Sequence, residues 1–175
     1  MIEIKALALE DCKSISDIDA SQHIGKAWRE VDGLLQLVEI DYFDPSWPNG
    51  YETHLKHLVE IVVGDGLAVG AFDHRQKMIG FVAVRRDFFG ESARYVLLDQ
   101  LFITREARGK GLGRKLFEAA AEGARQWGAE KLYICAGSAE ETIAFYWAIG
   151  CKTAVEVNRA LFDADPRDLQ MEFVL

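Results

Sequence analysis

The sequence lacks any hydrophobic run that approaches the roughly 20 residues needed to cross a bilayer. Its three cysteines, Cys12, Cys135 and Cys151, are an odd number without CxxC spacing, which argues against a disulfide framework or a thiolate zinc site. The first residues carry acidic side chains and alternate in hydropathy, so they do not resemble a secretory signal peptide. These features together predict a cytoplasmic protein with no membrane partner.

Internal repeats, low-complexity tracts and linkers rich in proline, glycine or serine are also absent. The chain has 175 residues, of which 50% are hydrophobic, and it contains 10 Phe, 5 Tyr and 4 Trp. Such a composition supplies a full hydrophobic core and is not typical of a disordered protein. We therefore expect one domain over residues 1–175.

Positive charge is scarce in the first third of the chain. Residues 1–60 contain 5 Lys/Arg and 12 Asp/Glu, a net charge of −7, while the whole chain has a net charge of −8. An acidic segment disfavours a nucleic-acid partner and favours a cationic one. The segment RGKGLGRK, residues 108–115, differs, because residues 105–115 carry a local net charge of +4. This local charge suggests a small anionic ligand.

Hydropathy periodicity predicts a mixture of strands and helices. The predicted strands are residues 2–8, 66–73, 78–86, 93–104, 130–137, 153–157 and 169–175, of which the second and third form a hairpin. The predicted helices are residues 49–63, 112–127 and 139–150, together with a helix start in residues 10–22. Pro45 and Pro48 mark an irregular segment. The mixture predicts an α/β or α+β domain.

The glycine-rich segment lies between a predicted strand and a predicted amphipathic helix. In such a place, backbone amides at the helix N-terminus bind phosphate groups, and glycines allow positive φ and close approach. The P-loop motif is absent, and the spacing G-x-G-x-G differs from the Rossmann pattern G-x-G-x-x-G. On the glycine pattern alone, a solvated basic loop remains the alternative.

The pattern R-x-x-G-x-G, which runs from Arg108 through Gly111 to Gly113, resembles the acetyl-CoA pyrophosphate motif of the GNAT superfamily of N-acetyltransferases. The flanking residues 97–118 resemble that family's fourth strand and third helix, and KLYICAG with ETIAFYWAIGC resembles its fifth strand and fourth helix. The similarity covers residues 95–151. It implies a mostly antiparallel sheet of about six to seven strands, with helices on both faces and a splay between strands four and five.

The resemblance implies acetyl-CoA as co-substrate and no metal. Pantetheine would pair with the backbone of the fourth strand at Leu101, Phe102 and Ile103. The pyrophosphate would bind the turn, whose residues are Arg108, Gly109, Lys110, Gly111, Leu112, Gly113 and Arg114, with added charge from its basic side chains. Ser138 stands where the family commonly has an asparagine, so it would either replace that contact with pantetheine or leave it weaker.

Direct attack of an amine on a thioester needs a neutral amine, donors for the oxyanion and a proton for the thiolate. Tyr146 in FYW matches the family's thiolate-protonating tyrosine, which implies that role; a core or rim tyrosine is the alternative. The oxyanion donor would be a backbone amide of the fourth strand near Phe102 or Ile103.

Asp99 is the candidate base, because some relatives carry a basic carboxylate on this strand. It shares strand parity with Leu97, Leu101 and Ile103, which predicts that the four side chains lie on one face of the sheet. The alternative role for Asp99 is that of a structural polar residue bonded to a neighbour.

The family takes its acceptor specificity from its first helices and loops, which correspond here to residues 20–62. We expect Trp28, Tyr42 and Trp47 to bind the acceptor, since aromatic rings interleaved with carboxylates suit a cationic amine. A lid or core edge with solvated acids is the alternative. His54 and His57 lie three residues apart, a spacing that can hold a metal, but the sequence offers no obvious further ligands. We therefore expect a surface or hydrogen-bonded pair, with a histidine base for the acceptor amine as the alternative.

The sequence therefore predicts an N-acetyltransferase that moves the acetyl group of acetyl-CoA to a primary amine of a small cationic metabolite or antibiotic-like acceptor. The alternatives are a protein or peptide amine acetyltransferase and a non-catalytic acyl-CoA-binding regulatory module. Nucleic acid is not expected as a partner. Many relatives are dimers, so a homodimer is also expected, although no residue pattern identifies its surface.

Overall fold

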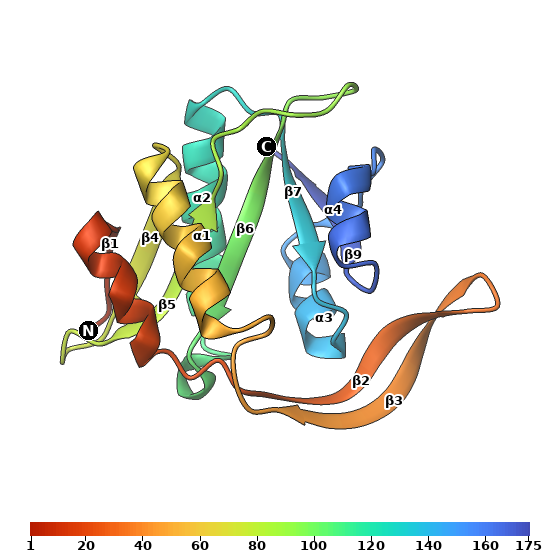
Figure 1. Ribbon diagram of the computed structural model, residues 1–175, viewed down its shortest axis with the longest axis horizontal. Coiled ribbons are helices and arrows are strands. Elements are labelled where there is room, and N and C mark those ends of the chain that lie inside the picture. Colours follow the sequence, from red (N-terminus) through yellow and green to blue (C-terminus); the bar gives the residue numbers. More distant parts are fainter.

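The computed structural model describes residues 1–175, and a seven-stranded sheet forms its centre (Figure 1). In spatial order the strands are β1 (Glu3–Ala6), β4 (Leu67–Phe72), β5 (Met78–Val84), β6 (Tyr95–Ile103), β7 (Lys131–Ala136), β9 (Leu169–Val174) and β8 (Lys152–Thr153). Every neighbouring pair is antiparallel except β6 and β7, which are parallel. This sheet confirms the predicted fold class.

Helices cover both faces of the sheet (Figure 1). One face carries the 3-10 helix η1 (Leu9–Asp17), α1 (Tyr51–Val63) and α4 (Arg159–Ala164), and we call it the α1 face. The opposite face carries α2 (Leu112–Gln126) and α3 (Glu140–Ala148), which bury the largest hydrophobic cluster with β5, β6 and β7. A short 3-10 helix, η2 (Arg105–Ala107), leads from β6 toward α2.

Residues 22–44 form an antiparallel hairpin outside the main sheet, which we call the arm. It consists of β2 (Gln22–Val31) and β3 (Leu34–Asp44), and it projects beyond the body of the molecule (Figure 1). The expectation of helices and loops was therefore wrong for these residues. The turn at Asp32 and Gly33 has positive φ at both positions, 51° and 77°, which is the Asp-Gly signal of a two-residue hairpin.

The predicted strand at residues 153–157 was also wrong. Of these residues only Thr153 belongs to β8, and the chain then departs from the sheet. The backbone amide of Val155 donates to the Glu172 side chain at Oε1, at 2.6 Å, rather than to a neighbouring strand. The segment then enters α4, whose first turn is capped by Asn158 Oδ1, the acceptor from Leu161 N at 3.1 Å. A local cap and a buried acceptor thus replaced the strand that the hydropathy pattern indicated.

A buried carboxylate joins β6, β7 and β9 where β6 and β7 begin. Glu172 is fully buried, with Lys131 Nζ 2.6 Å from Oε2, while Tyr95 Oη donates to Oε1 at 3.0 Å. Burial alone would raise the pKa of Glu172, but the hydrogen bonds from Lys131, Val155 and Tyr95 lower it below its usual value. This charge cluster fixes the three strands to one another at one end.

We predict that Lys131→Met lowers the free energy of unfolding by about 3 kcal/mol, because it leaves a buried carboxylate without its cation. Urea unfolding monitored by circular dichroism measures the change. Lys152→Met, on the exposed strand β8, is the matched control and should change stability little. Equal effects of the two substitutions would contradict a special role for the buried ion pair.

Candidate active site

Strands β6 and β7 pair for only part of their length. The parallel ladder joins Tyr95–Leu98 to Lys131–Ile134, and beyond these pairs both strands continue without bonding to each other. Asp99–Ile103 and Cys135–Ala136 therefore border an open wedge, with the Glu172 cluster at its closed end. The predicted splay between the fourth and fifth strands of the main sheet is confirmed.

A bulge in β6 lies where the wedge begins. Ala83 pairs with Gln100 and Val84 with Leu98, so Asp99 is an extra residue in β6. The shared face predicted for Asp99 is consequently only half right. Leu97 packs against the cluster below α4, on the α1 face, whereas Leu101 and Ile103 pack on the opposite face with α2. The extra residue changes the parity of the strand.

The bulge residue Asp99 contacts charged or titratable groups of α1 and of the end of β5. Asp99 Oδ2 lies 3.5 Å from His57 Nδ1 on α1, and Asp99 Oδ1 lies 3.4 Å from Arg85 Nε at the end of β5. Arg85 also contacts Glu60 on α1 at 3.4 Å. Asp99 Oδ2 is buried, and apart from the long contact to His57 it has no hydrogen-bond partner, so its capacity to accept a hydrogen bond is unused.

The glycine segment after η2 presents a row of free backbone donors. None of the six amides from Gly109 to Arg114 donates a hydrogen bond within the chain. Gly109 and Gly111 have φ of 75° and 85°, and a Cβ at either position would meet no atom within 4 Å. Gly113 instead lies against the Phe145 ring, where a Cβ would come within 3.1 Å. The arrangement suits an anion at the N-terminus of α2.

The basic side chains of this turn build the loop and leave its amides free. Arg108 donates to three carbonyl oxygens, those of Ile103 at 2.9 Å, Ser21 at 2.8 Å and Asp19 at 3.3 Å. Burial is the main cause that lowers the pKa of Arg108. The guanidinium therefore fixes the turn to β6 and to the start of the arm, and a direct contact of this side chain with a phosphate stays a prediction.

Lys110 and Arg114 lie at the surface of the same turn. Lys110 Nζ donates to Glu106 O at 2.9 Å, and Arg114 donates to Ala148 O at 3.4 Å in the last turn of α3. Leu112 is buried in the core below α2. At this turn the side chains contribute positive potential, while the backbone supplies the directed hydrogen bonds.

Tyr146 lies on α3 on the far side of the wedge. Its ring packs edge-on against Phe145 and Phe117 at centroid distances of 5.2 and 6.4 Å. The hydroxyl has no hydrogen-bond partner in the chain, and burial raises the pKa of Tyr146 well above its usual value. A phenol in this environment stays protonated and can donate its proton.

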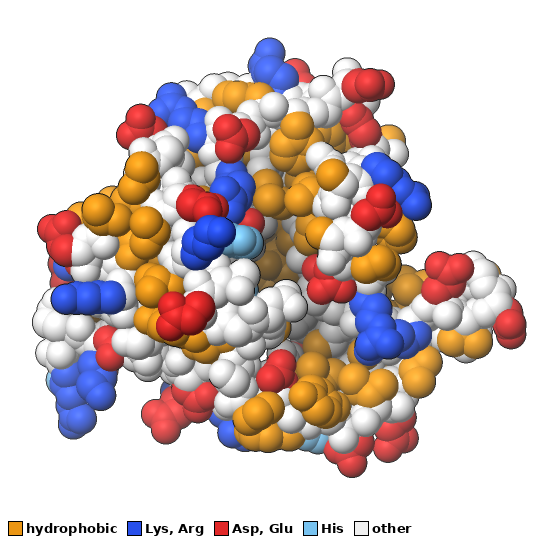
Figure 2. All heavy atoms as spheres, in the orientation of Figure 1, with side chains coloured by type: hydrophobic (Ala, Val, Ile, Leu, Met, Phe, Trp, Pro, Cys, Tyr) orange, Lys and Arg blue, Asp and Glu red, His pale blue; other side chains and the backbone are white.

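The α1 face is hollowed above the wedge. Figure 2 shows a recess over β6 and β7, between α1 and α4, with hydrophobic side chains on its floor and charged side chains at its rim. Cys135 of β7 lies near its floor, and its pKa is raised to about 12 by burial first and then by the charges of Asp168 and Asp99. Burial, with a smaller contribution from Asp165, raises the pKa of Asp168 to about 7.

Strand β2 crosses the open end of the wedge. Its beginning is tied to the end of β6 through Arg108 and Ser21, while its middle is tied to the start of α3, where Trp28 N donates to Ser138 O at 2.8 Å. Arg29 donates to Ser138 Oγ at 2.6 Å. The predicted contact of Ser138 with pantetheine would therefore share this hydroxyl with the arm.

The three aromatic residues predicted to bind the acceptor lie in different environments. Trp28 packs edge-on against Trp147 at 5.4 Å, and its buried indole Nε1 has no partner. Tyr42 is 54% exposed and pairs with Ile24 near the base of the arm. Trp47 is only 9% exposed and packs against Phe102 at 4.8 Å. This burial favours a core role for Trp47 over a role in binding the acceptor.

Sequence reasoning assigned His54 and His57 the role of a hydrogen-bonded or surface pair. His54 is hydrogen-bonded, since it bonds Gln100 Oε1 at 2.8 Å and Pro48 O at 2.5 Å. His57 instead lies beside Asp99, which makes it a candidate site residue that sequence reasoning did not select. Its position three residues before Glu60 was the available signal, because both side chains then lie on one face of α1.

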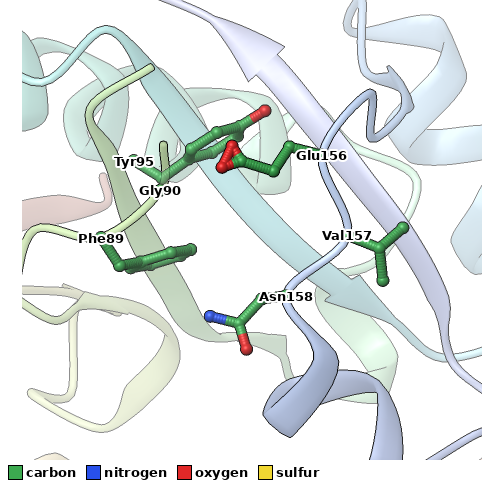
Figure 3. Close-up of a pocket in the computed structure, with 6 residues that line it drawn as sticks. All are labelled: Phe89, Gly90, Tyr95, Glu156, Val157 and Asn158. Carbon is green, nitrogen blue, oxygen red and sulfur yellow. The ribbon is translucent and has the colours of Figure 1, made fainter. Parts of the chain in front are cut away.

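A second pocket lies at the closed end of the wedge (Figure 3). Phe89, Gly90 and Tyr95 line one side, and residues 156–158 line the other. The Glu156 carboxylate accepts hydrogen bonds from the Glu91 and Ser92 amides and from Ser92 Oγ. These contacts satisfy the carboxylate and hold the loop, which leaves the open wedge as the better candidate for chemistry.

No group of three or more His, Cys, Asp or Glu side chains converges in a geometry that could hold a metal ion. None of the helices is both long and apolar enough to cross a membrane.

The sequence model of the acetyltransferase (GNAT) family matches residues 33–150. The match includes β3, α1, the glycine turn and both strands of the wedge. A search of curated protein sequences gives no match.

Solved structures share the fold over the whole chain. Nourseothricin acetyltransferase has 22% identity and a TM-score of 0.75, with 99% of this chain and 98% of that chain covered. A protein assigned as a streptothricin acetyltransferase from Bacillus anthracis str. Ames, in complex with acetyl-CoA, has 13% identity, a TM-score of 0.71 and coverage of 100% and 99%. PaiA N-acetyltransferase from Thermoplasma acidophilum, with CoA bound, has 18% identity, a TM-score of 0.62 and coverage of 100% and 99%.

We predict that Gly111→Ala weakens coenzyme A binding about tenfold, because a side chain at φ 85° disfavours the backbone that presents the amides. Isothermal titration calorimetry measures the affinity. Gly128→Ala is the matched control, since Gly128 has φ 86° and equally open surroundings but follows the other end of α2. Both substitutions should cost about 1 kcal/mol of stability. A similar loss of affinity in both variants would contradict the assignment.

Proposed function

Because the chain belongs to the acetyltransferase (GNAT) family, we propose that it transfers the acetyl group of acetyl-CoA to a primary amine of a small cationic acceptor by direct attack. One observation carries the proposal. The wedge between β6 and β7 brings the free amides of the glycine turn together with a buried, unpartnered carboxylate oxygen of Asp99. An anionic donor and a cationic acceptor then have complementary sites on opposite sides of one opening.

The donor side would take acetyl-CoA from the turn inward. The amides of Gly109–Arg114 would hold the pyrophosphate, and the edges of the wedge at Leu101, Phe102 and Ile103 would accept pantetheine. Ile103 O already accepts from Arg108, and β6 pairs with β5 along its other edge, so the available partners are the backbone groups of this stretch that face away from β5. Two structural neighbours with acetyl-CoA or CoA bound support this choice of co-substrate.

The chemistry would divide between the two sides of the wedge. On α3, the Tyr146 phenol, which burial and a raised pKa keep protonated, would give its proton to the departing thiolate sulfur. On β6, Asp99 would receive the acceptor ammonium as base or as anchor, with Oδ2 as the accepting atom. A backbone amide near Phe102 or Ile103 would stabilise the oxyanion.

The acceptor side favours a small cationic molecule. Carboxylates lie on this side of the wedge, because Glu60 and Asp99 contact Arg85 and the charges of Asp168, Asp99 and Asp165 act on Cys135. Strand β2 is bonded to Ser138 at the open end of the wedge. Two structural neighbours, nourseothricin acetyltransferase and the Bacillus anthracis protein assigned as a streptothricin acetyltransferase, are named after antibiotics. Their names support a cationic antibiotic or related metabolite as the substrate class. A homodimer stays a prediction.

We predict that Tyr146→Phe lowers kcat about 10- to 100-fold while the acetyl-CoA KM changes less than about twofold, because the substitution removes only the proton donor. Thiol release measured with a chromogenic disulfide reports both values. Tyr51→Phe, at the start of α1, is the matched control. An unchanged kcat would remove Tyr146 from the mechanism.

Thiol release over a panel of amines tests the acceptor. The panel contains a streptothricin, an aminoglycoside, spermidine and a short peptide with a free N-terminus. We expect turnover with the small cations and little with the peptide. Preference for the peptide would indicate a protein amine acetyltransferase. Coenzyme A binding without turnover of any amine would indicate a non-catalytic acyl-CoA-binding protein.

A further inference from the structure

His57 and Asp99 form a pair with one exposed and one buried end. His57 Nδ1 lies 3.5 Å from Asp99 Oδ2, and the side chains are 40% and 11% exposed. The separation is long and poorly aligned for a hydrogen bond, and Oδ2 has no partner. The two atoms come from different elements, α1 and β6, so the fold holds them apart across a narrow space.

One nitrogen atom can lie beside this pair of atoms. With Nδ1 and Oδ2 3.5 Å apart, a nitrogen off the line between them reaches both at about 2.8 Å. A primary ammonium has three N–H groups and could donate to both atoms at once. We propose that His57 Nδ1 and Asp99 Oδ2 together hold the acceptor ammonium and that His57 takes its proton, which makes His57 a catalytic residue. This inference rests on the proposed function.

Neighbouring charged side chains hold the Asp99 carboxylate in its orientation toward His57 without bonding to Oδ2. Glu60, on the same face of α1, contacts Arg85, and Arg85 contacts Asp99 Oδ1. This chain of ion pairs orients the carboxylate, so that Oδ2 points toward His57. Across the wedge, Cys135 on β7 is close enough to interact electrostatically with Asp99, and the charges of Asp168 and Asp165 also act on it. No other histidine faces this space, because His54 is bonded to Gln100 and Pro48.

Imidazole is suited to the proton transfer. Histidine is the side chain that ordinarily changes charge between about pH 5 and 8, so it can take a proton and release it within one cycle. The 40% exposure of His57 gives that proton a path to solvent. Asp99 then has an electrostatic task, because its charge stabilises first the ammonium and then the imidazolium.

The protons balance as follows. The acceptor enters as an ammonium and loses one proton to His57, which passes it to solvent. The neutral amine nitrogen then forms the C–N bond as the thioester C–S bond breaks. The nitrogen loses a second proton, and this proton replaces the one that the Tyr146 phenol gives to the thiolate. The products are the acetylated amine, coenzyme A thiol and one proton in solution.

The test separates proton transfer from positioning. His57→Asn keeps an acceptor atom near the position of Nδ1 but cannot take a proton, so kcat should fall about 100-fold or more. The acceptor KM should change less than about threefold, and the acid limb of the kcat–pH profile should disappear. Asp99→Asn should instead raise the acceptor KM. His74→Asn, in the exposed β4–β5 turn, is the matched control and should behave as wild type.

The measurements use the full chain and the panel amine with the highest kcat/KM. Coenzyme A affinity and melting temperature are measured for each variant, and His57→Gln is tested in parallel in case His57→Asn is destabilised. Variants of His57 that keep the wild-type rate and pH profile would overturn the inference and leave the proposed function standing. Wild-type protein that turns over no amine would overturn the proposed function itself.

Discussion

The parting of β6 and β7 is the constraint on which the rest of the molecule depends. The hydrogen bonds between these parallel strands end after Leu98 and Ile134. Beyond that point, backbone groups that a sheet normally satisfies are exposed, so other contacts must hold the strands apart. The Glu172 ion pair with Lys131 fixes the closed end. Strand β2 fixes the open end, because it is bonded to both sides of the gap. The arm thereby completes a site that the main sheet cannot close by itself.

The glycine turn shows how an acidic protein can bind an anion. The Arg108 guanidinium donates its hydrogen bonds to backbone carbonyl oxygens, so this side chain serves mainly to stabilise the loop. The directed donors are the amides of Gly109–Arg114, which no part of the chain uses. Backbone amides held by a helix N-terminus need no reorganisation to meet a phosphate, whereas long basic side chains would lose rotamer freedom on binding. The glycines matter because they permit this backbone.

The sequence predicted the elements that obey local rules. The strands and helices from residue 49 to residue 151 follow from periodicity and caps, and the glycine turn follows from its position between them. The predictions failed where a distant group intervened. The predicted strand at residues 153–157 ends after Thr153, because the Val155 amide bonds Glu172. The parity argument for Asp99 failed because a bulge inserts one residue into β6, and a bulge has no signature in the hydropathy pattern.

The sequence by itself determined the proposed donor side of the site, because a glycine turn at a helix start is set by residues adjacent in the chain. Only the tertiary structure decided the proposed acceptor side. His57 and Asp99 are far apart in the sequence, and their 3.5 Å separation results from the packing of α1 across β5 and from the bulge in β6. Trp47 and Trp28 look alike in the sequence, yet packing buries one and places the other beside α3. Contacts between distant segments depend on how whole elements pack, and residue spacing does not encode that packing.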